Sequence, residues 1–463
     1  MESTPAGRNA TSRTEVPACV VVVGAGLAGL GAAWRLTRRG HRVIVLERRS
    51  WLGGRAAGEL DRGFSIERGI AALTHADRHL VQLIGELGLS GSLLPLRLLQ
   101  LAQAQGDRVA PIDPSTRRGA ARIPGVSLLD GLRLVRLPRL VGRYRPLLDP
   151  DRPERGARWD DRSIADFAKL YFGSSSYERW IEPEAMSVYL SDAAETSRVA
   201  FLLGWIARGG GRARPGVPRA PLAEIVRAAS EALDVRTRCR VERIEPTRSG
   251  YELHVRSGDR SERAFEADAV VLATAAPEAE RLASSLIGPA ERDHLRDVSY
   301  APAVTLNVAL ERPLTGLPQW VRVPRVERSP VAAYLAEPGL GGGRAPDGCG
   351  VLTACGAEEF GLAHAGSPDE VVTKTLFDGL ERFHPRLGGL VRFVHLSRSV
   401  GAIPHFQVGA YRALERFRRV QRDRRESGRR VYFAGDYLNG PRAEQALSSG
   451  LRAAVELDTD FRT

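Results

Sequence analysis

Lysine is almost missing from this chain. Of its 67 Lys and Arg residues only Lys169 and Lys374 are lysines, which leaves 65 arginines. The chain has four cysteines and no C-x-x-C pair, so neither a metal site nor a redox-active dithiol is predicted. We expect the four thiols to be buried and unreactive, as suits a reducing cytoplasm.

Long apolar runs are also absent. No stretch approaches the roughly 18 consecutive apolar residues of a membrane-spanning helix, so none is predicted. Residues 1–17 are polar and lack the apolar core of a secretory signal, and we expect them to form a mobile leader. The expected location is therefore the cytoplasm.

The composition is otherwise ordinary. Apolar residues make up 43% and charged residues 26% of the 463 residues, as in globular proteins with more than one domain. The net charge of +12 raises the question of an anionic partner. No recognition helix or aromatic-interleaved basic stretch occurs, so nucleic acid is not an expected partner. Residues 126–148 alternate leucines with arginines at near-helical spacing, which is typical either of a membrane-surface helix or of a packed helix pair with a solvated arginine face.

A glycine-rich turn near the N-terminus carries the first functional motif. The β-branched run Val20–Val23 predicts a buried strand, a helix is expected through Arg39, and a second strand over Arg42–Leu46. The turn between the first strand and the helix consists of Gly24, Ala25, Gly26, Leu27, Ala28 and Gly29.

Each glycine in this turn has a physical role. Gly24 permits a tight turn, Gly26 allows a pyrophosphate to approach the backbone, and Gly29 allows close packing of helix and strand. Glu47 ends the second strand 23 residues after Gly24, where a carboxylate accepts hydrogen bonds from ribose hydroxyls and disfavours a 2′-phosphate. The spacing predicts a Rossmann-like site for an adenine dinucleotide other than NADP.

The residues that follow resemble a known flavoprotein superfamily. Arg48, Gly53, Gly54 and Arg55 are similar to the Gly-Gly-Arg loop of the FAD-dependent amine oxidases, phytoene desaturases and protoporphyrinogen oxidases. In that superfamily the loop wraps the FAD pyrophosphate. Residues 63–70, which include Gly69 and Ile70, resemble the segment that runs beneath the flavin ring.

The far end of the chain resembles the other half of the same site. A strand is expected over Val431–Ala434 and a helix from about Ala443, and the residues implied to contact the flavin are Gly435, Asp436, Gln445 and Ala446. Between the two halves, residues 235–244 resemble a strand whose Val241 backbone meets the adenine. Residues 267–276, which include Ala273, resemble a strand that passes the dinucleotide. Four segments in family order imply FAD as the cofactor.

These segments imply an α/β fold with two interleaved domains. A Rossmann-like FAD-binding domain is expected from residues 18–75, 218–285 and 425–460. An α+β substrate-binding domain is expected from residues 76–217 and 286–424. Within these blocks, residues 161–173 predict an amphipathic helix and residues 411–430 a solvated one.

The sequence says less about the substrate pocket than about the cofactor site. The chain resembles the protoporphyrinogen oxidase branch most, yet no catalytic residue is assigned, and for each polar candidate a structural role is the alternative. Amine oxidases of the superfamily commonly carry a lysine on a substrate-domain strand, and residues 304–313 contain none. The polar candidates for substrate contact are Tyr189, Tyr300, Arg398, His405 and Arg442.

Arg442 distinguishes this chain from the amine oxidase branch of the superfamily. Amine oxidases of the superfamily place an aromatic wall at the position of Arg442, two residues before the glutamate of the closing helix, and a guanidinium is a poor wall for an approaching amine. We expect an FAD-dependent oxidase or desaturase that takes a hydride from a largely apolar small molecule, with or without a carboxylate, and passes the electrons to O₂ or a quinone-like acceptor. The alternatives are an amine or amino-acid oxidase, a flavin-dependent isomerase, and an FAD-stabilised scaffold protein.

Overall fold

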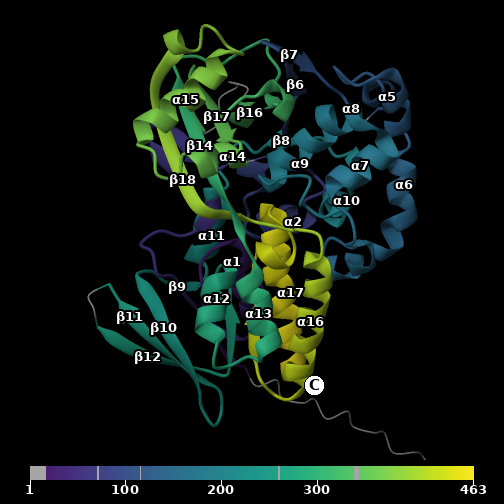
Figure 1. The fold of residues 1–463 in the computed structure, drawn as a ribbon. Helices are drawn as coiled ribbons and strands as arrows, with labels where there is room; N and C mark the ends of the chain where they lie inside the picture. The colour runs from purple at the N-terminus through teal and green to yellow at the C-terminus, as the bar shows by residue number, and fades with distance from the viewer. Residues whose placement is uncertain (1–16, 70–71, 115, 259–260, 338–343, 463) are drawn as a thin grey trace, which may run out of the picture.

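Two β-sheets from interleaved stretches of the chain organise the molecule (Figure 1). The computed structural model describes residues 17–462 except 70–71, 115, 259–260 and 338–343. All but the last residue of the predicted leader, and Ile70 of the predicted flavin segment, therefore lie outside the described residues. No helix in the described part of the chain is both long and apolar enough to cross a membrane.

The first sheet has five strands, all parallel, in the order β19-β13-β1-β2-β9. Its central strands are rich in Val, Ile and Leu because helices cover both faces of a parallel sheet. The strands come from all three segments predicted for the FAD-binding domain, although the exact boundaries stay predictions. They are β1 (Cys19–Val23), β2 (Arg42–Leu46), β9 (Asp234–Arg236), β13 (Ala269–Leu272) and β19 (Val431–Phe433).

The two helices that start at this sheet pack against each other along their length. They are α1 (Leu27–Arg38) and α17 (Ala443–Arg462), which lie side by side in Figure 1. A Cβ on Gly450 would lie 1.9 Å from the carbonyl oxygen of Ala28, so only glycine permits this approach. The N- and C-terminal halves of the predicted site are joined through this contact.

The strand predicted over residues 235–244 is in fact two strands. The chain leaves β9, turns at Arg238 with a φ of +54°, and enters β10, so the two parts belong to different sheets. The strand expected over 267–276 is also shorter, because Ala267 ends β12 and Ala276 begins α12. A smaller sheet of three strands contains β10 (Cys239–Pro246), β11 (Tyr251–Ser257) and β12 (Glu262–Ala267).

A mixed sheet of seven strands forms the core of the other domain, in the order β18-β14-β17-β16-β15-β6-β7. Helices α14 (Glu358–Ala363) and α15 (Asp369–Glu381) cover one of its faces. Its strands are β6 (Leu101–Gln105), β7 (Arg108–Pro111), β14 (Tyr300–Leu310), β15 (Trp320–Arg322), β16 (Val331–Ala336), β17 (Gly350–Gly356) and β18 (Val391–Pro404).

A block of helices lies beside the seven-stranded sheet (Figure 1). The amphipathic helix predicted over 161–173 is α7, which begins after Ser163, whose hydroxyl accepts a hydrogen bond from the N–H of Asp166. Pro138 stands in the first turn of α6, where a missing N–H costs nothing, so it starts a helix instead of breaking one. The main helices here are α5 (Leu128–Leu134), α6 (Leu137–Tyr144), α7 (Ile164–Phe172), α9 (Glu182–Tyr189) and α10 (Arg198–Ala207).

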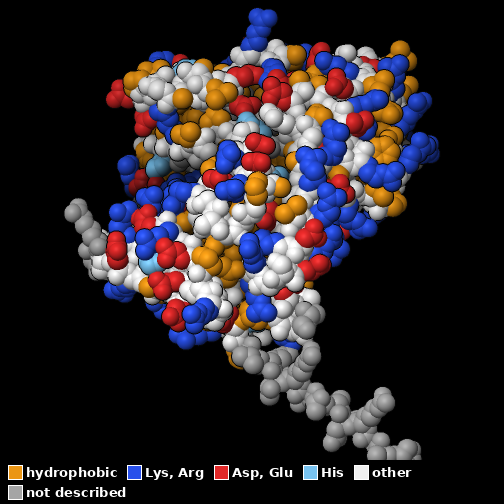
Figure 2. Space-filling view, turned by 60° about the horizontal axis from the view of Figure 1, so that its bottom comes forward, with side chains coloured by type: hydrophobic (Ala, Val, Ile, Leu, Met, Phe, Trp, Pro, Cys, Tyr) orange, Lys and Arg blue, Asp and Glu red, His pale blue; other side chains and the backbone are white. Residues whose placement is uncertain are grey.

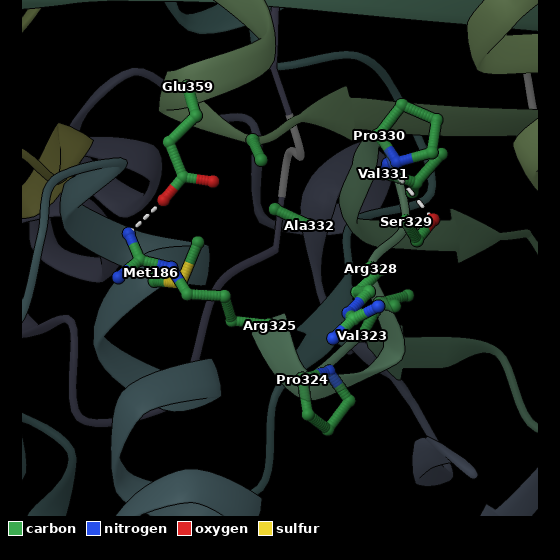
Figure 3. A pocket seen from close by; sticks show the side chains of 11 residues that line it. Met186, Val323, Pro324, Arg325, Arg328, Ser329, Pro330, Val331, Ala332 and Glu359 are labelled. Atoms are coloured by element: carbon green, nitrogen blue, oxygen red, sulfur yellow. Dashed lines mark hydrogen bonds and ion pairs between the residues drawn. The ribbon is translucent and has the colours of Figure 1, made fainter. Parts of the chain in front are cut away.

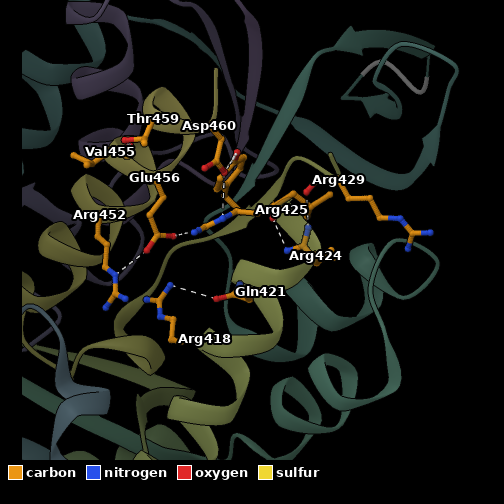
Figure 4. Close-up of polar contacts among 12 residues, drawn as sticks. Arg418, Gln421, Arg424, Arg425, Arg429, Arg452, Val455, Glu456, Thr459 and Asp460 are labelled. Atoms are coloured by element: carbon orange, nitrogen blue, oxygen red, sulfur yellow. Dashed lines mark hydrogen bonds and ion pairs between the residues drawn. The ribbon is translucent and has the colours of Figure 1, made fainter. Parts of the chain in front are cut away.

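The prediction that residues 411–430 form a solvated helix is wrong for one face. Helix α16 (Ala410–Glu426) buries a stripe that includes Phe417 and two arginines. Arg424 donates to Glu291 at 3.0 Å and to the carbonyl oxygen of Val431 at 2.7 Å. Figure 4 shows Arg418 beside Gln421, and Arg425 joined to Glu456 of α17. Helix α16 thus packs against the dinucleotide-binding sheet, although its sequence lies in the predicted substrate block.

The remaining short elements connect these layers. They are β3 (Gly58–Asp61), β4 (Phe64–Glu67), α2 (Arg78–Glu86), α3 (Ser90–Leu93), β5 (Arg97–Leu98), α4 (Arg117–Ala120), α8 (Ser174–Ser176), β8 (Gly216–Val217), α11 (Ala223–Glu231), α12 (Ala276–Ala283) and α13 (Pro289–Asp297). The four cysteines are all partly exposed and none forms a disulfide, so the expectation of fully buried thiols is wrong.

Candidate active site

The glycine-rich turn has the geometry that a pyrophosphate requires. Gly24 has a φ of +107°, and a Cβ there would lie 2.7 Å from the carbonyl oxygen of Ala273. A Cβ on Gly29 would lie 1.9 Å from the carbonyl oxygen of Gly24. At Gly26, in contrast, a Cβ would meet no atom within 4 Å. The turn is closed on the protein side and open at the position where phosphate oxygens would approach the first N–H groups of α1.

Glu47 lies at the edge of the same turn. Its Oε2 accepts a hydrogen bond from the N–H of Ala25 at 3.0 Å, and its Oε1 accepts one from the N–H of Arg49 at 2.9 Å. The main chain of Glu47 also pairs with Arg236 and Cys239. These contacts hold the carboxylate beside the turn, where it can accept hydrogen bonds from a ribose.

The Gly-Gly-Arg loop joins the two ends of the chain. Gly53 and Gly54 have φ values of +93° and +57°, and the N–H of Gly53 donates to the carbonyl oxygen of Ala25 at 2.9 Å. Arg55 donates to both carboxylate oxygens of Asp436, at 2.6 and 2.7 Å, and to the carbonyl oxygen of Ala402 at 2.6 Å. Burial raises the pKa of Asp436, and the neighbouring Arg55 offsets only part of that rise.

The start of α17 completes the site. The N–H of Gly435 donates to Ser449 of α17 at 3.0 Å, which holds the Gly435–Asp436 corner against the helix. The side chain of Gln445 accepts a hydrogen bond from the N–H of Arg442 at 3.1 Å and caps the first turn. The N–H groups of Gln445 and Ala446 both donate to the carbonyl oxygen of Arg442 at 3.0 Å. The positive end of the helix dipole at this start can stabilise negative charge on a bound group.

The other predicted cofactor contacts lie around this core. The carbonyl oxygen of Val241 accepts a hydrogen bond from Arg281 at 3.2 Å, and the N–H of Ala273 donates to the carbonyl oxygen of Val23 at 2.9 Å. Arg48 is exposed next to Glu47. A Cβ on Gly69 would meet nothing within 4 Å, so a ligand can approach its backbone closely.

The comparisons with known proteins agree with this geometry. The profile of the flavin-containing amine oxidoreductases matches residues 27–458, which is nearly the whole chain. The chain belongs to this family. It is therefore an FAD-dependent oxidoreductase with the α/β fold of that family, as the resemblance implies. The FAD fits the residues described above: an open approach at Gly26, a carboxylate beside the turn, and the starts of α1 and α17, where the helix dipoles favour negative charge.

Individual relatives are distant. The AofH protein of Mycobacterium tuberculosis, named as a flavin-containing monoamine oxidase, is 31% identical over 160 residues, which are 34% of either chain. A carotenoid phi-ring synthase of Streptomyces griseus is 32% identical over 292 residues, 58% of this chain and 54% of the synthase. The chain thus matches only about a third to a half of the length of these relatives.

Solved structures match over the whole fold. A protein named as a protoporphyrinogen oxidase from Exiguobacterium sp. 255-15 superposes with a TM-score of 0.72 at 19% identity, over 96% of this chain and 99% of the other. A variant of putrescine oxidase superposes with a TM-score of 0.79 at 18% identity, with the same coverage. At such identities these matches show the fold alone.

The five polar candidates for substrate contact have different surroundings. The hydroxyl of Tyr189 donates to the carbonyl oxygen of Ala200 at 2.7 Å. The hydroxyl of Tyr300 accepts from the N–H of Ala276 at 2.9 Å, and its ring centroid is 6.0 Å from the Arg55 guanidinium. Tyr300 therefore lies beside the loop that the family uses for FAD, and Tyr189 lies in the helical block.

Arg398 and His405 have partners outside this region. Arg398 donates to the carbonyl oxygens of His364, Ala365 and Ser367, which follow α14, and to Asp369. His405 contacts Ser299 at 3.0 Å and Glu358 at 2.9 Å. These contacts favour structural roles for both residues. Arg442, the fifth candidate, contacts Asp77 at 2.8 Å and is largely buried.

Thr305 and Asn307, on the strand where amine oxidases of the superfamily carry their lysine, were not among the predicted site residues. The hydroxyl of Thr305 donates to the carbonyl oxygen of Arg68 at 3.1 Å, and the amide of Asn307 donates to the carbonyl oxygen of Glu67 at 2.8 Å. Both side chains therefore face the segment that resembles the one beneath the flavin. The signals in the sequence for this face were the polar alternation of β14 and the resemblance of residues 304–313 to the family's lysine-bearing strand.

A cavity of about 350 Å³ lies on the opposite face of the sheet (Figure 3). Val323 and Ala332 line it, and both belong to the apolar cluster that packs against α14 and α15. Figure 3 shows Arg325 paired with Glu359 across it. That cluster also contains Val304 and Leu306, which alternate along β14 with Thr305 and Asn307, so this cavity is separate from the face that meets the cofactor segments.

Proposed function

We propose that the protein dehydrogenates a largely apolar small molecule by hydride transfer to flavin N5, as the protoporphyrinogen oxidases and phytoene desaturases of the superfamily do. The bound FAD supplies the hydride acceptor. The chain's own residues hold the reacting C–H bond in a pocket that excludes water. The observation that carries this proposal is Arg442, a buried cation at the start of the closing helix.

Amine oxidation is the principal alternative, since a variant of putrescine oxidase has the same fold. Two features disfavour it. Strand β14 contains no lysine, and the side chains that face the cofactor segments there are Thr305 and Asn307. Arg442 stands where amine oxidases of the superfamily have an aromatic wall, and its guanidinium, which is paired with Asp77, is a poor wall for an amine. A flavin isomerase is the second alternative, and its product would have the mass of its substrate.

Anaerobic reduction of the flavin tests the proposal. The FAD-loaded enzyme is mixed without oxygen with tetrapyrrole, polyene and amine candidates, and the visible absorbance of the oxidised flavin is followed. We expect bleaching by a polyene or tetrapyrrole and none by amines. Bleaching by amines alone would contradict the proposal. Admission of air or of a soluble quinone to the bleached enzyme then identifies the class of acceptor.

We also propose a peripheral contact with an anionic membrane through α5, α6 and the end of α7. Four leucines on α5 and α7 are strongly exposed: Leu128 73%, Leu129 69%, Leu132 55% and Leu170 64%. Exposed arginines accompany them, namely Arg133, Arg136, Arg139, Arg143 and Arg145. Figure 2 shows blue and orange side chains next to one another along the edge of the molecule where Figure 1 places α6. Exposed leucines beside arginines favour anionic lipid surfaces.

Sedimentation with vesicles tests the membrane contact. The wild-type enzyme should sediment with phosphatidylserine-containing vesicles and remain in solution with vesicles of phosphatidylcholine alone. Combined substitution of Leu128, Leu129 and Leu132 by serine should lower the bound fraction at least about tenfold, because each buried leucine contributes about 1.5–3 kcal/mol. Val400→Ser, at an exposed position elsewhere, is the control. Equal sedimentation of the triple variant and the wild type would refute the contact.

A further inference from the structure

Three arginines from distant parts of the chain converge on one buried carboxylate. Arg208 follows α10, Arg322 ends β15 and Arg442 precedes α17. Arg208 Nη2 lies 2.5 Å from Oε1 of Glu184, and Arg322 Nη1 lies 2.5 Å from its Oε2. Burial raises the pKa of Glu184, but the positive charges of Arg208, Arg322 and Arg442 lower it by more. We call these three residues the arginine cluster.

The arginine cluster has more donors than its carboxylates satisfy. Asp77 is the second carboxylate and binds Nη2 of Arg442 at 2.8 Å. The three guanidinium groups face Glu184 and Asp77, and a third carboxylate, Glu444, lies near Arg442 and Asp77 and accepts from the N–H groups of His79 and Leu80. Within the described part of the chain, Nε of Arg322 and Nη1 of Arg442 are buried and donate to no acceptor. Buried charged donors without acceptors are costly unless a ligand meets them.

The register of the seven-stranded sheet places Arg322 on the face toward the cofactor segments. Directly paired residues of neighbouring strands lie on the same face, and the pairs run from Thr305 through Cys355 and Ala333 to Arg322. Thr305 at the start of this row contacts the carbonyl oxygen of Arg68. Small side chains thus separate Arg322 from the segment that resembles the one beneath the flavin.

The other end of the arginine cluster lies at the closing helix. Arg442 precedes Gln445 and Ala446, which the family resemblance places at the flavin. The side chain of Arg322 is only 9% exposed. The arginine cluster therefore joins the sheet face that meets the cofactor segments to the start of α17, in an environment where a charged ligand is poorly screened by water.

We propose that the arginine cluster binds the carboxylate of the substrate. This inference rests on the proposed function and restricts its substrate to carboxylated apolar molecules. A carboxylate has two oxygens, which can accept from the buried donors without acceptors, Arg322 Nε and Arg442 Nη1. Anchored there, the apolar part of the substrate extends along the row of Ala333, Cys355 and Thr305 toward the flavin.

A matched pair of probes tests this assignment. Hexanoate and hexanamide differ in charge but not in chain length, and their binding to the FAD-loaded enzyme is measured by calorimetry. We expect hexanoate to bind at least about tenfold more tightly than hexanamide, because hydrogen bonds between ions are stronger than neutral ones. Equal affinities, or no measurable binding of hexanoate, would overturn the proposal.

Substitutions locate the binding to the arginine cluster. Arg322→Met and Arg442→Met should each weaken hexanoate about 10- to 100-fold and leave hexanamide unchanged. Glu184→Gln removes a competing carboxylate and should strengthen hexanoate severalfold. Arg227→Met, on the exposed face of α11, is the control and should change neither. Unchanged hexanoate affinity in Arg442→Met and Glu184→Gln would overturn the proposal even if Arg322→Met does not fold.

The outcome is separable from that of the proposed function. Failure of every tetrapyrrole and polyene to bleach the flavin would reject the proposed reaction, while charge-selective binding of hexanoate would still support the carboxylate site. Bleaching by an uncharged polyene, together with equal binding of the two probes, would support the reaction and reject the carboxylate site.

Discussion

The variant Gly26→Val is expected to fold normally and to be purified without FAD. A Cβ at Gly26 meets no protein atom within 4 Å, and the residue has an extended φ of −79°, so valine is compatible with the apoprotein. The same side chain would occupy the space through which a pyrophosphate approaches the backbone. We expect FAD affinity to fall at least about 100-fold, or about 2.7 kcal/mol. Flavin absorbance after purification and fluorescence titration with FAD measure the loss.

The matched variant Gly29→Val separates cofactor binding from folding. A Cβ there would lie 1.9 Å from the carbonyl oxygen of Gly24, so the turn must move or the helix must shift. We expect the apoprotein to lose about 3 kcal/mol of unfolding free energy, the range of overpacking in a tight contact. The apoprotein of Gly26→Val should have the same melting temperature as the wild-type apoprotein, and that of Gly29→Val should melt at a much lower temperature. A Gly26→Val protein that retains FAD would show that the turn does not carry the pyrophosphate.

Loss of Arg55 is the second large effect expected. Arg55→Ala removes the two hydrogen bonds that Arg55 donates to the buried carboxylate of Asp436 and leaves it the one from the N–H of Tyr437. Breaking one partner of such a pair costs about 3 kcal/mol. The unfolding free energy of the apoprotein in urea measures this cost without a contribution from FAD. The double variant Arg55→Ala/Asp436→Asn should recover most of it, since the amide carries no charge. A double variant as unstable as Arg55→Ala would contradict this explanation.

The pH dependence of Arg55→Ala has a defined sign. Burial already raises the pKa of Asp436 above 3.8, and removal of Arg55 takes away the charge that lowers it. The folded state then binds a proton more tightly than the unfolded state. Stability therefore falls as the pH rises from 3.8 through the raised pKa. The unfolding free energy of the variant should be closest to that of the wild type in weakly acidic buffer. The two should differ most at pH 8, which is roughly four units above the ordinary carboxyl pKa.

The sequence alone was sufficient to predict the parts of the site that are built from residues close together in the chain. The turn after β1 and Glu47 after β2 are set by glycine positions and by β-branched runs, and these local signals are physically strong. The same reasoning placed the helix that begins at Ala443. It was weaker where one residue changes the direction of the chain, as at Arg238, because a positive φ on arginine has no sequence signal.

The tertiary structure decided which charged side chains meet. Nothing local to Arg442 indicates Asp77, which lies 365 residues away, and nothing local to Arg322 indicates Glu184. The composition showed the excess of arginine over lysine, but it did not show which arginines are buried against carboxylates. Planar guanidinium groups can be buried only where carboxylates or carbonyl oxygens receive their donors, and those acceptors are brought together by the packing of distant elements. Sequence patterns therefore determined the cofactor, whereas the packing of α9, β15 and α17 brought Arg208, Arg322 and Arg442 together around Glu184 and Asp77.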